Sequence, residues 1–295
     1  MSSNQILHDT VETIRKLASA EPAEPTVERV VVGLYFTGVK LSTGHVGACA
    51  TPSKSATSAA CCPDAGHASP LPGTLRGRRA LDLVGETQHP DGVRRAVGIA
   101  AMNALAALCW DRRPHPDMTL EAGIDAFAAA DIRPGQQVVI VGAFVPFLRE
   151  LKRRQQPYLV LERNPGALKP DELPFYRPAA EAATVVPQAD VLLITGTTLL
   201  NDTIDPILAA ARPDATKVVV GPTVGLVPDA YLRRGCDVLG GIRVTRPDAF
   251  LDVLAEAGAG HHFFGRSAEK IVLRAHKPVR SPHADANETR LTAVP

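Results

Sequence analysis

The chain lacks the features that mark several large classes of protein. Its 295 residues carry a net charge of only +1, with 32 Lys and Arg against 31 Asp and Glu, whereas a nucleic-acid footprint requires a clustered basic face. No apolar run reaches the roughly 18 residues that span a membrane. The N-terminal residues also lack the basic start and apolar core of a secretory signal. We therefore expect a cytoplasmic protein that binds neither nucleic acid nor membrane.

Signatures of several well-known sites are also missing. No Ser-His-Asp order or paired-carboxylate motif specifies hydrolysis, and the spacing of Cys and His matches no zinc-finger template. The five cysteines are an odd number, and thiols are their default state in a reducing compartment. The sequence therefore assigns no catalytic residue.

Four short apolar segments in the second half of the chain each end in small or polar residues. They are residues 138–141, 158–161, 190–194 and 217–220. Near-continuous apolar strands of this kind are typical of a parallel sheet buried between helices. We expect helices at 146–154, 202–211, 228–234 and 247–257, and a last strand at 270–274. The right-handed crossover rule then predicts an α/β fold with a Rossmann-like, doubly wound parallel sheet.

The first half shows a different pattern, which predicts a smaller α+β domain. An amphipathic helix is expected at 4–18, and an antiparallel meander at 30–36, 39–41 and 46–50. Helices are expected at 75–84, at 93–110 beneath the meander, and at 120–130 as a connection. We place the domains at 1–118 and 119–278, with a disordered tail at 279–295 and a long irregular loop at 51–73.

Parallel sheets bind ligands in the crevice beyond the carboxyl ends of their strands, so the residues at these ends are candidates. Gly142 ends the first strand, but Phe144 and Pro146 replace the glycines of G-x-G-x-x-G, which argues against NAD. Glu162 follows 20 residues after Gly142, at the usual spacing of an acid that binds ribose hydroxyls. The alternative is a solvated carboxylate at a strand end.

The loop from Thr195 to Thr203 is the most unusual stretch of the second half. It places hydroxyls, an amide and a glycine between a strand and a helix, and helix capping accounts for part of this pattern. We favour a polar ligand site there, with the end of the next strand as its neighbouring wall. Its candidate residues are Thr195, Gly196, Thr197, Thr198, Asn201, Thr203, Gly221 and Thr223.

Cysteines and histidines gather in the first half of the chain, where six fall within 45 residues. They are His45, Cys49, Cys61, Cys62, His67 and His89. Thiolates and imidazoles bind zinc, copper or nickel, which makes His45, Cys61, Cys62 and His67 candidate metal ligands. The alternative is that the thiols are buried and the histidines exposed, without a metal.

Several segments resemble the putative heavy-metal chelation domain family over residues 5–275. The resemblance lies mainly in the string from Ile194 to Thr203, with support from 220–223, 239–241, 33–37 and 97–104. It implies an N-terminal domain similar to that of enolase, a Rossmann-like C-terminal domain, and a site in the cleft between them. It carries no catalytic assignment.

Two functions stay open at this stage. The first is binding of a transition metal ion, a metal chelate or a related small molecule in the interdomain cleft, with a role in heavy-metal chelation or metallophore handling. The second is an enzyme that uses S-adenosylmethionine or another nucleoside-type cofactor, with Glu162 on the ribose and Phe144 stacked on the base. A non-catalytic assembly protein is the remaining alternative, and a homodimer is the default assembly.

Overall fold

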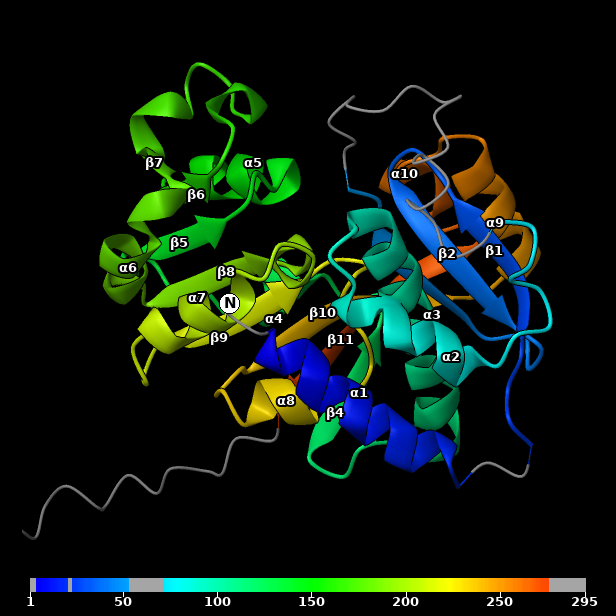
Figure 1. Ribbon diagram of the computed structural model, residues 1–295. Helices are drawn as coiled ribbons and strands as arrows, with labels where there is room; N and C mark the ends of the chain where they lie inside the picture. The colour runs from blue at the N-terminus through cyan, green and yellow to red at the C-terminus, as the bar shows by residue number, and fades with distance from the viewer. Residues whose placement is uncertain (1–3, 21–22, 53–71, 276–295) are drawn as a thin grey trace, which may run out of the picture.

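The computed structural model describes residues 4–20, 23–52 and 72–275, and these residues form two β-sheets covered by helices (Figure 1). The larger sheet has eight strands in the order β4-β11-β10-β9-β8-β5-β6-β7. Its strands are β4 (Met118–Ala122), β5 (Val138–Val141), β6 (Tyr158–Glu162), β7 (Tyr176–Pro178), β8 (Val191–Thr195), β9 (Thr216–Val220), β10 (Val238–Val244) and β11 (Ala268–Ala275).

Six of these strands are parallel, from β7 at one edge through to β10. Numbered along the chain, their spatial order is 3-2-1-4-5-6, which is the strand order of the doubly wound sheet. β11 pairs antiparallel with β10, and β4 pairs antiparallel with β11 at the far edge of the sheet. The order reverses between β5 and β8, and a doubly wound sheet binds its ligands at this switch point.

Helices cover both faces of the larger sheet because its central strands are apolar on both sides. In β5, Val138 and Ile140 pack with α4 and α5, whereas Val139 and Val141 belong to the core on the other face. That second core also includes residues of α1, α3, α7 and α8. The helix bounds are α1 (Gln5–Ala18), α3 (Gly92–Arg112), α4 (Ala126–Ala129), α5 (Val145–Arg153), α6 (Ala182–Val185), α7 (Ile204–Ala210) and α8 (Asp229–Leu232).

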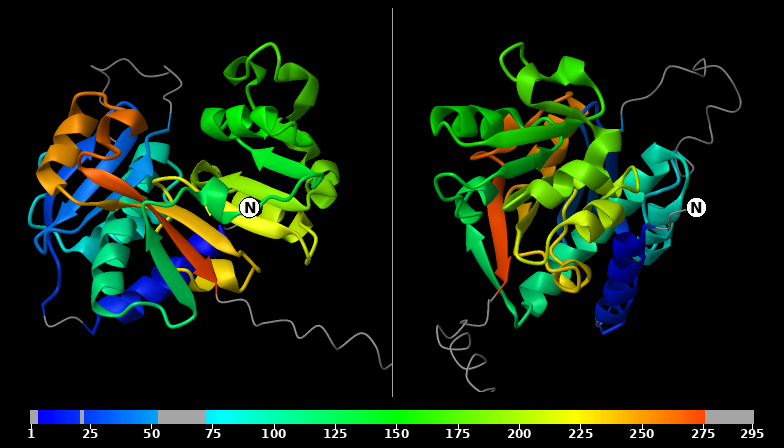
Figure 2. Two further views of the ribbon diagram at one scale, coloured as in Figure 1. Left: turned by 180° about the vertical axis from the view of Figure 1, so that it is seen from behind. Right: turned by 90° about the vertical axis from the view of Figure 1, so that its left-hand side faces the viewer.

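The smaller sheet is the predicted antiparallel meander of β1 (Val27–Val32), β2 (Phe36–Leu41) and β3 (Val46–Ala50). One face packs on α3, and Gly47 allows the close approach, because a Cβ there would lie 2.2 Å from Ala100 O and Ala104 N. The other face is covered by α9 (Pro247–Ala255) and α10 (Gly260–Phe263). Figure 2 shows these late helices, in orange, against the early strands, in blue.

Helix α3 is the central helix of the molecule. It is long and apolar enough to cross a membrane by length and composition alone, but 78% of its apolar window is buried inside the protein. Its buried residues touch the meander, the short α2 (Ala80–Val84), the 3₁₀ turn at Gly85–Gln88 and α1. The composition of α3 therefore fits a core helix.

Four expectations from the sequence need correction. Residues 120–130 do not form one helix, since β4 pairs with β11 and Gly123, at φ +78°, ends the strand before α4. β10 and the short β7 are strands that the sequence reading omitted. The helix expected at 75–84 begins only at Ala80, because the preceding residues form a turn that bonds to Val27.

Some expectations lie outside the described residues, namely the tail at 279–295 and most of the loop at 51–73.

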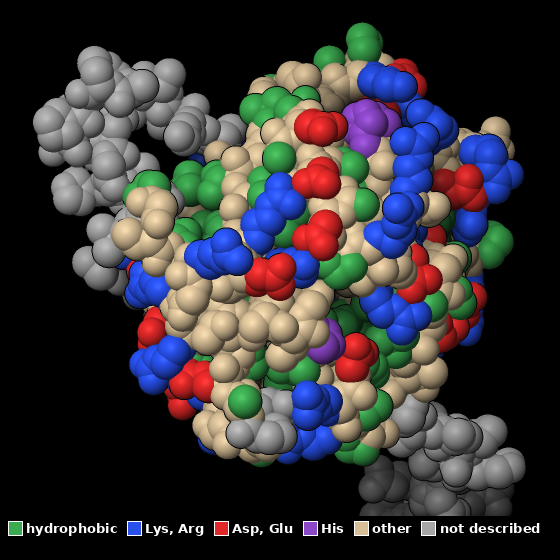
Figure 3. Space-filling view, turned by 90° about the vertical axis from the view of Figure 1, so that its right-hand side faces the viewer, with side chains coloured by type: hydrophobic (Ala, Val, Ile, Leu, Met, Phe, Trp, Pro, Cys, Tyr) green, Lys and Arg blue, Asp and Glu red, His purple; other side chains and the backbone are tan. Residues whose placement is uncertain are grey.

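On the face drawn in Figure 3, Lys and Arg side chains are interspersed with Asp and Glu. Both signs of charge therefore occur on that face, as the near-neutral composition leads one to expect.

Candidate functional site

A cavity of about 280 Å³ lies at the carboxyl ends of β5, β6 and β8, next to the switch point of the larger sheet. We call it the switch-point cavity. Its lining is Val141, Gly142, Leu161, Glu162, Arg163, Ala179, Ala182, Ala183, Thr195, Thr197, Thr198, Asn201, Thr203, Pro206 and Ile207. The structure thus brings together Gly142, Glu162 and five residues of the predicted loop, from three different strand ends.

Gly142 is required by the backbone at the end of β5. Its φ of +97° is rarely adopted by other residues, and a Cβ would lie 2.9 Å from Cγ2 of Thr195. The ends of β5 and β8 therefore approach each other closely at the base of the cavity.

Glu162 lines the cavity and accepts hydrogen bonds from the backbone of the neighbouring loops. Its Oε2 accepts from the backbone N–H of Ala143 at 3.0 Å, and its Oε1 accepts from Arg163 at 2.7 Å and Asn164 at 3.1 Å. A carboxylate offers about four acceptor sites, so one remains after these three bonds. Glu162 is therefore neither a free ligand nor a simple solvated carboxylate, because it already connects the ends of β5 and β6.

The hydroxyls of the Thr195–Thr203 loop are ordered by bonds among themselves. Thr195 Oγ1 accepts from the N–H of Thr197 at 3.3 Å and from its hydroxyl at 3.1 Å. Its own proton is thus available to an acceptor in the cavity. Thr198 is 1% exposed and donates to Thr195 O at 2.7 Å, which shapes the turn. Thr195 and the exposed Thr197 are the loop hydroxyls best placed for a ligand.

The first helix and the core helix hold this loop from behind. Asp202 has a φ of +58°, an uncommon conformation that Asp tolerates better than most residues. Its carboxylate accepts from Arg95 Nη1 at 2.8 Å and from Asn4 Nδ2 at 3.1 Å. The same two side chains donate to the carbonyls of Leu200 and Leu199. Elements from the N-terminal end of the chain therefore position a loop of the switch-point cavity.

Four predicted residues do not line this cavity. Phe144 stacks on Phe147, with ring centroids 5.0 Å apart. Gly196 packs against the loop after β9, where a Cβ would meet Thr223 Cβ at 3.1 Å and a methyl group of Val224 at 3.0 Å. Thr223 is 1% exposed and accepts from Ala50 N, and Gly221 follows β9 with a φ of +136°. These loops form a wall beside the cavity.

Of the four predicted metal ligands, His45 alone lies within the described residues. Cys61, Cys62 and His67 fall in the segment that the structure does not describe. Cys49 is fully buried in β3, and burial raises the pKa of its thiol, which disfavours the thiolate that metals bind. Within the described ranges, no group of three or more His, Cys, Asp or Glu could hold a metal ion.

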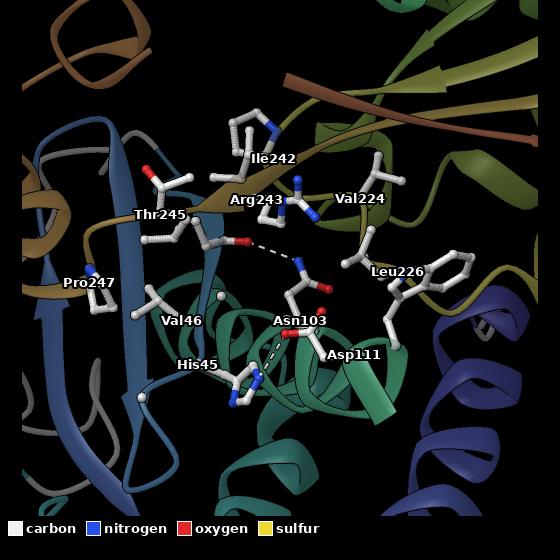
Figure 4. A pocket seen from close by; sticks show the side chains of 18 of the residues that line it. His45, Val46, Asn103, Asp111, Val224, Leu226, Ile242, Arg243, Thr245 and Pro247 are labelled. Carbon is white, nitrogen blue, oxygen red and sulfur yellow. Dashed lines mark hydrogen bonds and ion pairs between the residues drawn. The ribbon is translucent and has the colours of Figure 1, made fainter. Parts of the chain in front are cut away.

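His45 lines a second cavity, of about 300 Å³, which we call the junction cavity (Figure 4). It lies between β3 and α3 on one side and the loop after β9 and the end of β10 on the other. His45 Nε2 is 3.2 Å from Asp111 Oδ2, and its Nδ1 is 3.0 Å from the Thr43 hydroxyl. Of these two cavities, the 195–203 loop lines the switch-point cavity and His45 lines the junction cavity, so the structure does not bring His45 and that loop together in either one.

Two groups of site residues were missed by the sequence reading. The apolar wall of the switch-point cavity comes from Ala179, Ala182 and Ala183, which carry no recognisable chemistry. Asn103 lines the junction cavity from the middle of α3. An amide within an otherwise apolar helix was a usable signal, because a buried amide needs hydrogen-bond partners.

Comparison with known proteins places the chain among uncharacterised relatives. Two family models match, both described as "Putative heavy-metal chelation", over residues 125–273 and 14–106. An uncharacterised protein of Methanocaldococcus jannaschii is 29% identical over 178 residues, which cover 60% of this chain and 65% of that protein. The matched region thus spans slightly less than two thirds of that relative.

Two solved structures share the fold over almost the whole chain. A protein of unknown function from Pyrococcus horikoshii gives a TM-score of 0.70 at 20% identity, covering 92% of this chain and 100% of that one. A protein of unknown function from Desulfitobacterium hafniense gives 0.68 at 19% identity, covering 90% and 98%. Both are assigned to the family whose model matches residues 125–273 here. At these identities the likeness shows the fold alone.

Proposed function

The chain belongs to the family described as "Putative heavy-metal chelation", and we propose that it binds an organic small molecule in the switch-point cavity. One observation carries the proposal. Gly142, Glu162, Thr195, Thr197, Thr198, Asn201 and Thr203 all line a single cavity at the point where the strand order reverses. Doubly wound sheets bind their ligands at this position.

A nucleoside-type ligand, such as S-adenosylmethionine, fits the two walls of this cavity best. The remaining acceptor site of Glu162 suits a ribose hydroxyl, and the hydroxyls of Thr195 and Thr197 suit polar atoms of the sugar or its substituent. The opposite wall is apolar, from Ala179, Ala182, Ala183, Pro206 and Ile207, and suits the faces of a base. Phe144 has no part in this arrangement, because it packs on Phe147.

A metal chelate is the second candidate, favoured by the family description. Threonine hydroxyls and one carboxylate are poor ligands for a soft heavy metal, which prefers thiolate and imidazole. The Thr195 hydroxyl, whose proton is not used within the loop, can donate to a carboxylate or phenolate oxygen of an organic chelator. In this form of the proposal, the protein recognises the metallophore or its precursor, and the metal enters as cargo.

The test is a cavity-filling substitution with a matched control. Ala183 is an exposed residue of the lining, so Ala183→Trp fills the cavity without disturbing the core. Glu181 lies two residues earlier, is exposed and does not line the cavity, so Glu181→Trp serves as the control. We expect calorimetric binding of S-adenosylmethionine or adenosine by the wild type and the control, and loss of binding in Ala183→Trp.

Two other outcomes separate the candidates. If neither nucleoside binds and elemental mass spectrometry of untagged protein detects a metal together with a bound organic molecule, the chelate form is correct. A metal bound at near-stoichiometric level without an organic ligand, and lost in a Cys61→Ser/Cys62→Ser variant, contradicts both forms. That result would instead establish the ion site predicted at His45, Cys61, Cys62 and His67.

The assembly and the domain division belong to the same proposal. We infer a homodimer, to be tested by sedimentation equilibrium, and two domains at 1–118 and 119–278. Because α9 and α10 cover the smaller sheet, limited proteolysis near residue 118 should leave two fragments that remain associated.

A further inference from the structure

Asn103, which lines the junction cavity, carries a buried hydrogen-bond acceptor that has no partner among the described residues. Asn103 is 6% exposed, and its Nδ2 donates to Ala48 O and to Thr223 O, each at 2.9 Å. Its Oδ1 has no hydrogen bond. The orientation of the amide is fixed, because an oxygen in the position of Nδ2 would face two carbonyl oxygens. Buried acceptors are nearly always paired, so this atom points to a missing donor.

The other end of the cavity carries a second acceptor. Asp111 is on α3, eight residues after Asn103, and both side chains line the cavity (Figure 4). Eight residues of α-helix span about 12 Å. The Asp111 carboxylate is 56% exposed and contacts His45. The cavity thus extends along one face of α3, from a buried neutral acceptor to a carboxylate at its mouth.

The wall between these ends is mainly apolar. Ala107 lies between Asn103 and Asp111 on the same helix, and Val46, Val224 and Leu226 line the cavity as well. Arg243 also reaches it, but its guanidinium is paired with Glu269 at 2.7 Å. A volume of about 300 Å³ is roughly ten times the share of one water molecule in liquid. The cavity therefore has the size and lining of a site for a small organic molecule.

We propose that the junction cavity binds a small molecule with an N–H donor at its buried end, a short apolar body and a protonated amine at its outer end. The N–H group donates to Asn103 Oδ1, the apolar body lies along Ala107, and the ammonium group meets Asp111. A carboxylate at the inner end is disfavoured, because it would place an anion against a carbonyl oxygen. This site is separate from the switch-point cavity, since the two linings share no residue.

The probe is 6-aminohexanamide, which has an amide and an amine at opposite ends of a five-carbon chain. Two matched compounds remove one feature each. In 6-aminohexanoate a carboxylate replaces the amide, and hexanamide lacks the amine. The chain's single tryptophan, Trp110, lines the cavity, so its fluorescence reports occupancy directly, and calorimetry gives the affinity.

We expect 6-aminohexanamide to bind about tenfold or more tightly than either matched compound, as the loss of one charge-assisted or buried hydrogen bond implies. Asp111→Asn should lower its affinity about tenfold and leave hexanamide unaffected. Ala107→Phe should abolish binding of both amides by filling the cavity. Asp117→Asn changes an exposed acid outside the lining and should have no effect.

Three results would overturn the proposal. They are no binding of 6-aminohexanamide at millimolar concentration, equal affinity for the amide and the carboxylate, or unchanged affinity in Asp111→Asn. Asp111 is largely exposed, so its substitution tests the outer contact even if Ala107→Phe does not fold. S-adenosylmethionine and adenosine fill a different cavity, so their binding or failure to bind does not affect these results.

Discussion

Replacing Asn103 should destabilise the protein more than any surface amide, because its side chain connects the two sheets. Asn103→Ala removes the bonds from Nδ2 to Ala48 O in β3 and to Thr223 O after β9. Each buried carbonyl that loses its partner costs about 1–3 kcal/mol, and removal of the unpaired Oδ1 returns about 1–2 kcal/mol. The net loss in unfolding free energy should be about 1–4 kcal/mol.

The stability of the Asn103→Asp variant should depend on pH. An ionised carboxylate would face the two carbonyl oxygens, whereas the neutral acid can donate to one of them, so the folded protein raises the pKa of this Asp above about 3.9. A group whose pKa is raised on folding contributes its full stability below its unfolded pKa, and that contribution is lost as the pH rises. The variant should therefore approach Asn103→Ala in stability at low pH and fall below it near neutrality.

The assay is urea unfolding followed by circular dichroism and by the fluorescence of Trp110, which is in the same helix. Asn201→Ala, at an exposed position, is the control and should change the unfolding free energy by no more than about 0.5 kcal/mol. If Asn103→Ala shifts the urea midpoint no further than Asn201→Ala, the hydrogen bonds of Asn103 do not hold the two sheets together. A pH-independent Asn103→Asp would show that the aspartate reaches water.

Three further predictions concern other parts of the structure. Gly47→Ala places a Cβ 2.2 Å from backbone atoms of α3, so thermal unfolding should show a loss of about 3 kcal/mol or no folded protein. Gly142→Ala places a side chain at a φ of +97° and close to Thr195, so it should lower the unfolding free energy by about 1–3 kcal/mol and weaken ligand binding in the switch-point cavity. The control is Gly135→Ala, in a turn with open space, which should leave ligand binding unchanged. Burial opposes ionisation of Asp9, but hydrogen bonds from Gln5, Arg233 and Arg234 outweigh it and lower the pKa of Asp9 to about 2. The Asp9→Asn variant should therefore lose about 1–2 kcal/mol of unfolding free energy at pH 7. This deficit relative to the wild type should shrink as the pH falls from about 4 towards 2.

Much of the larger sheet was predictable because its signal is local. The strand from Val138 to Val141 is apolar at every position, and a strand buried on both faces must be. The position of the switch-point cavity follows from the same pattern, since parallel strands align their carboxyl ends. The sequence therefore indicates that Glu162 and the Thr195–Thr203 loop lie at neighbouring strand ends, as they do around this cavity, but it does not reveal their bonds to the backbone.

The missed parts depend on contacts between distant segments. β4 is a strand because Leu120 pairs with Leu273 of β11, and nothing near residue 120 reveals that partner. β10 contains Gly240 and Gly241, and glycine weakens a strand interior, so the local sequence does not indicate this strand. In the structure, a Cβ at Gly240 would lie 2.6 Å from Ala126 Cβ. These glycines therefore allow α4 and the loop after β9 to pack closely against the strand.

The cover of α9 and α10 over the meander also sets an order of events during synthesis. The strands of the meander are complete by Ala50, but the helices that bury their outer face begin at Pro247. At roughly 5–20 residues per second, the ribosome takes roughly 10–40 seconds to make the intervening chain. During that interval the apolar side chains of β1–β3 that later meet Phe250 and Leu254 lack the partners that α9 and α10 supply. The nascent protein thus exposes an unfinished sheet until α9 and α10 have been made, and we expect it to be most prone to aggregation during that interval.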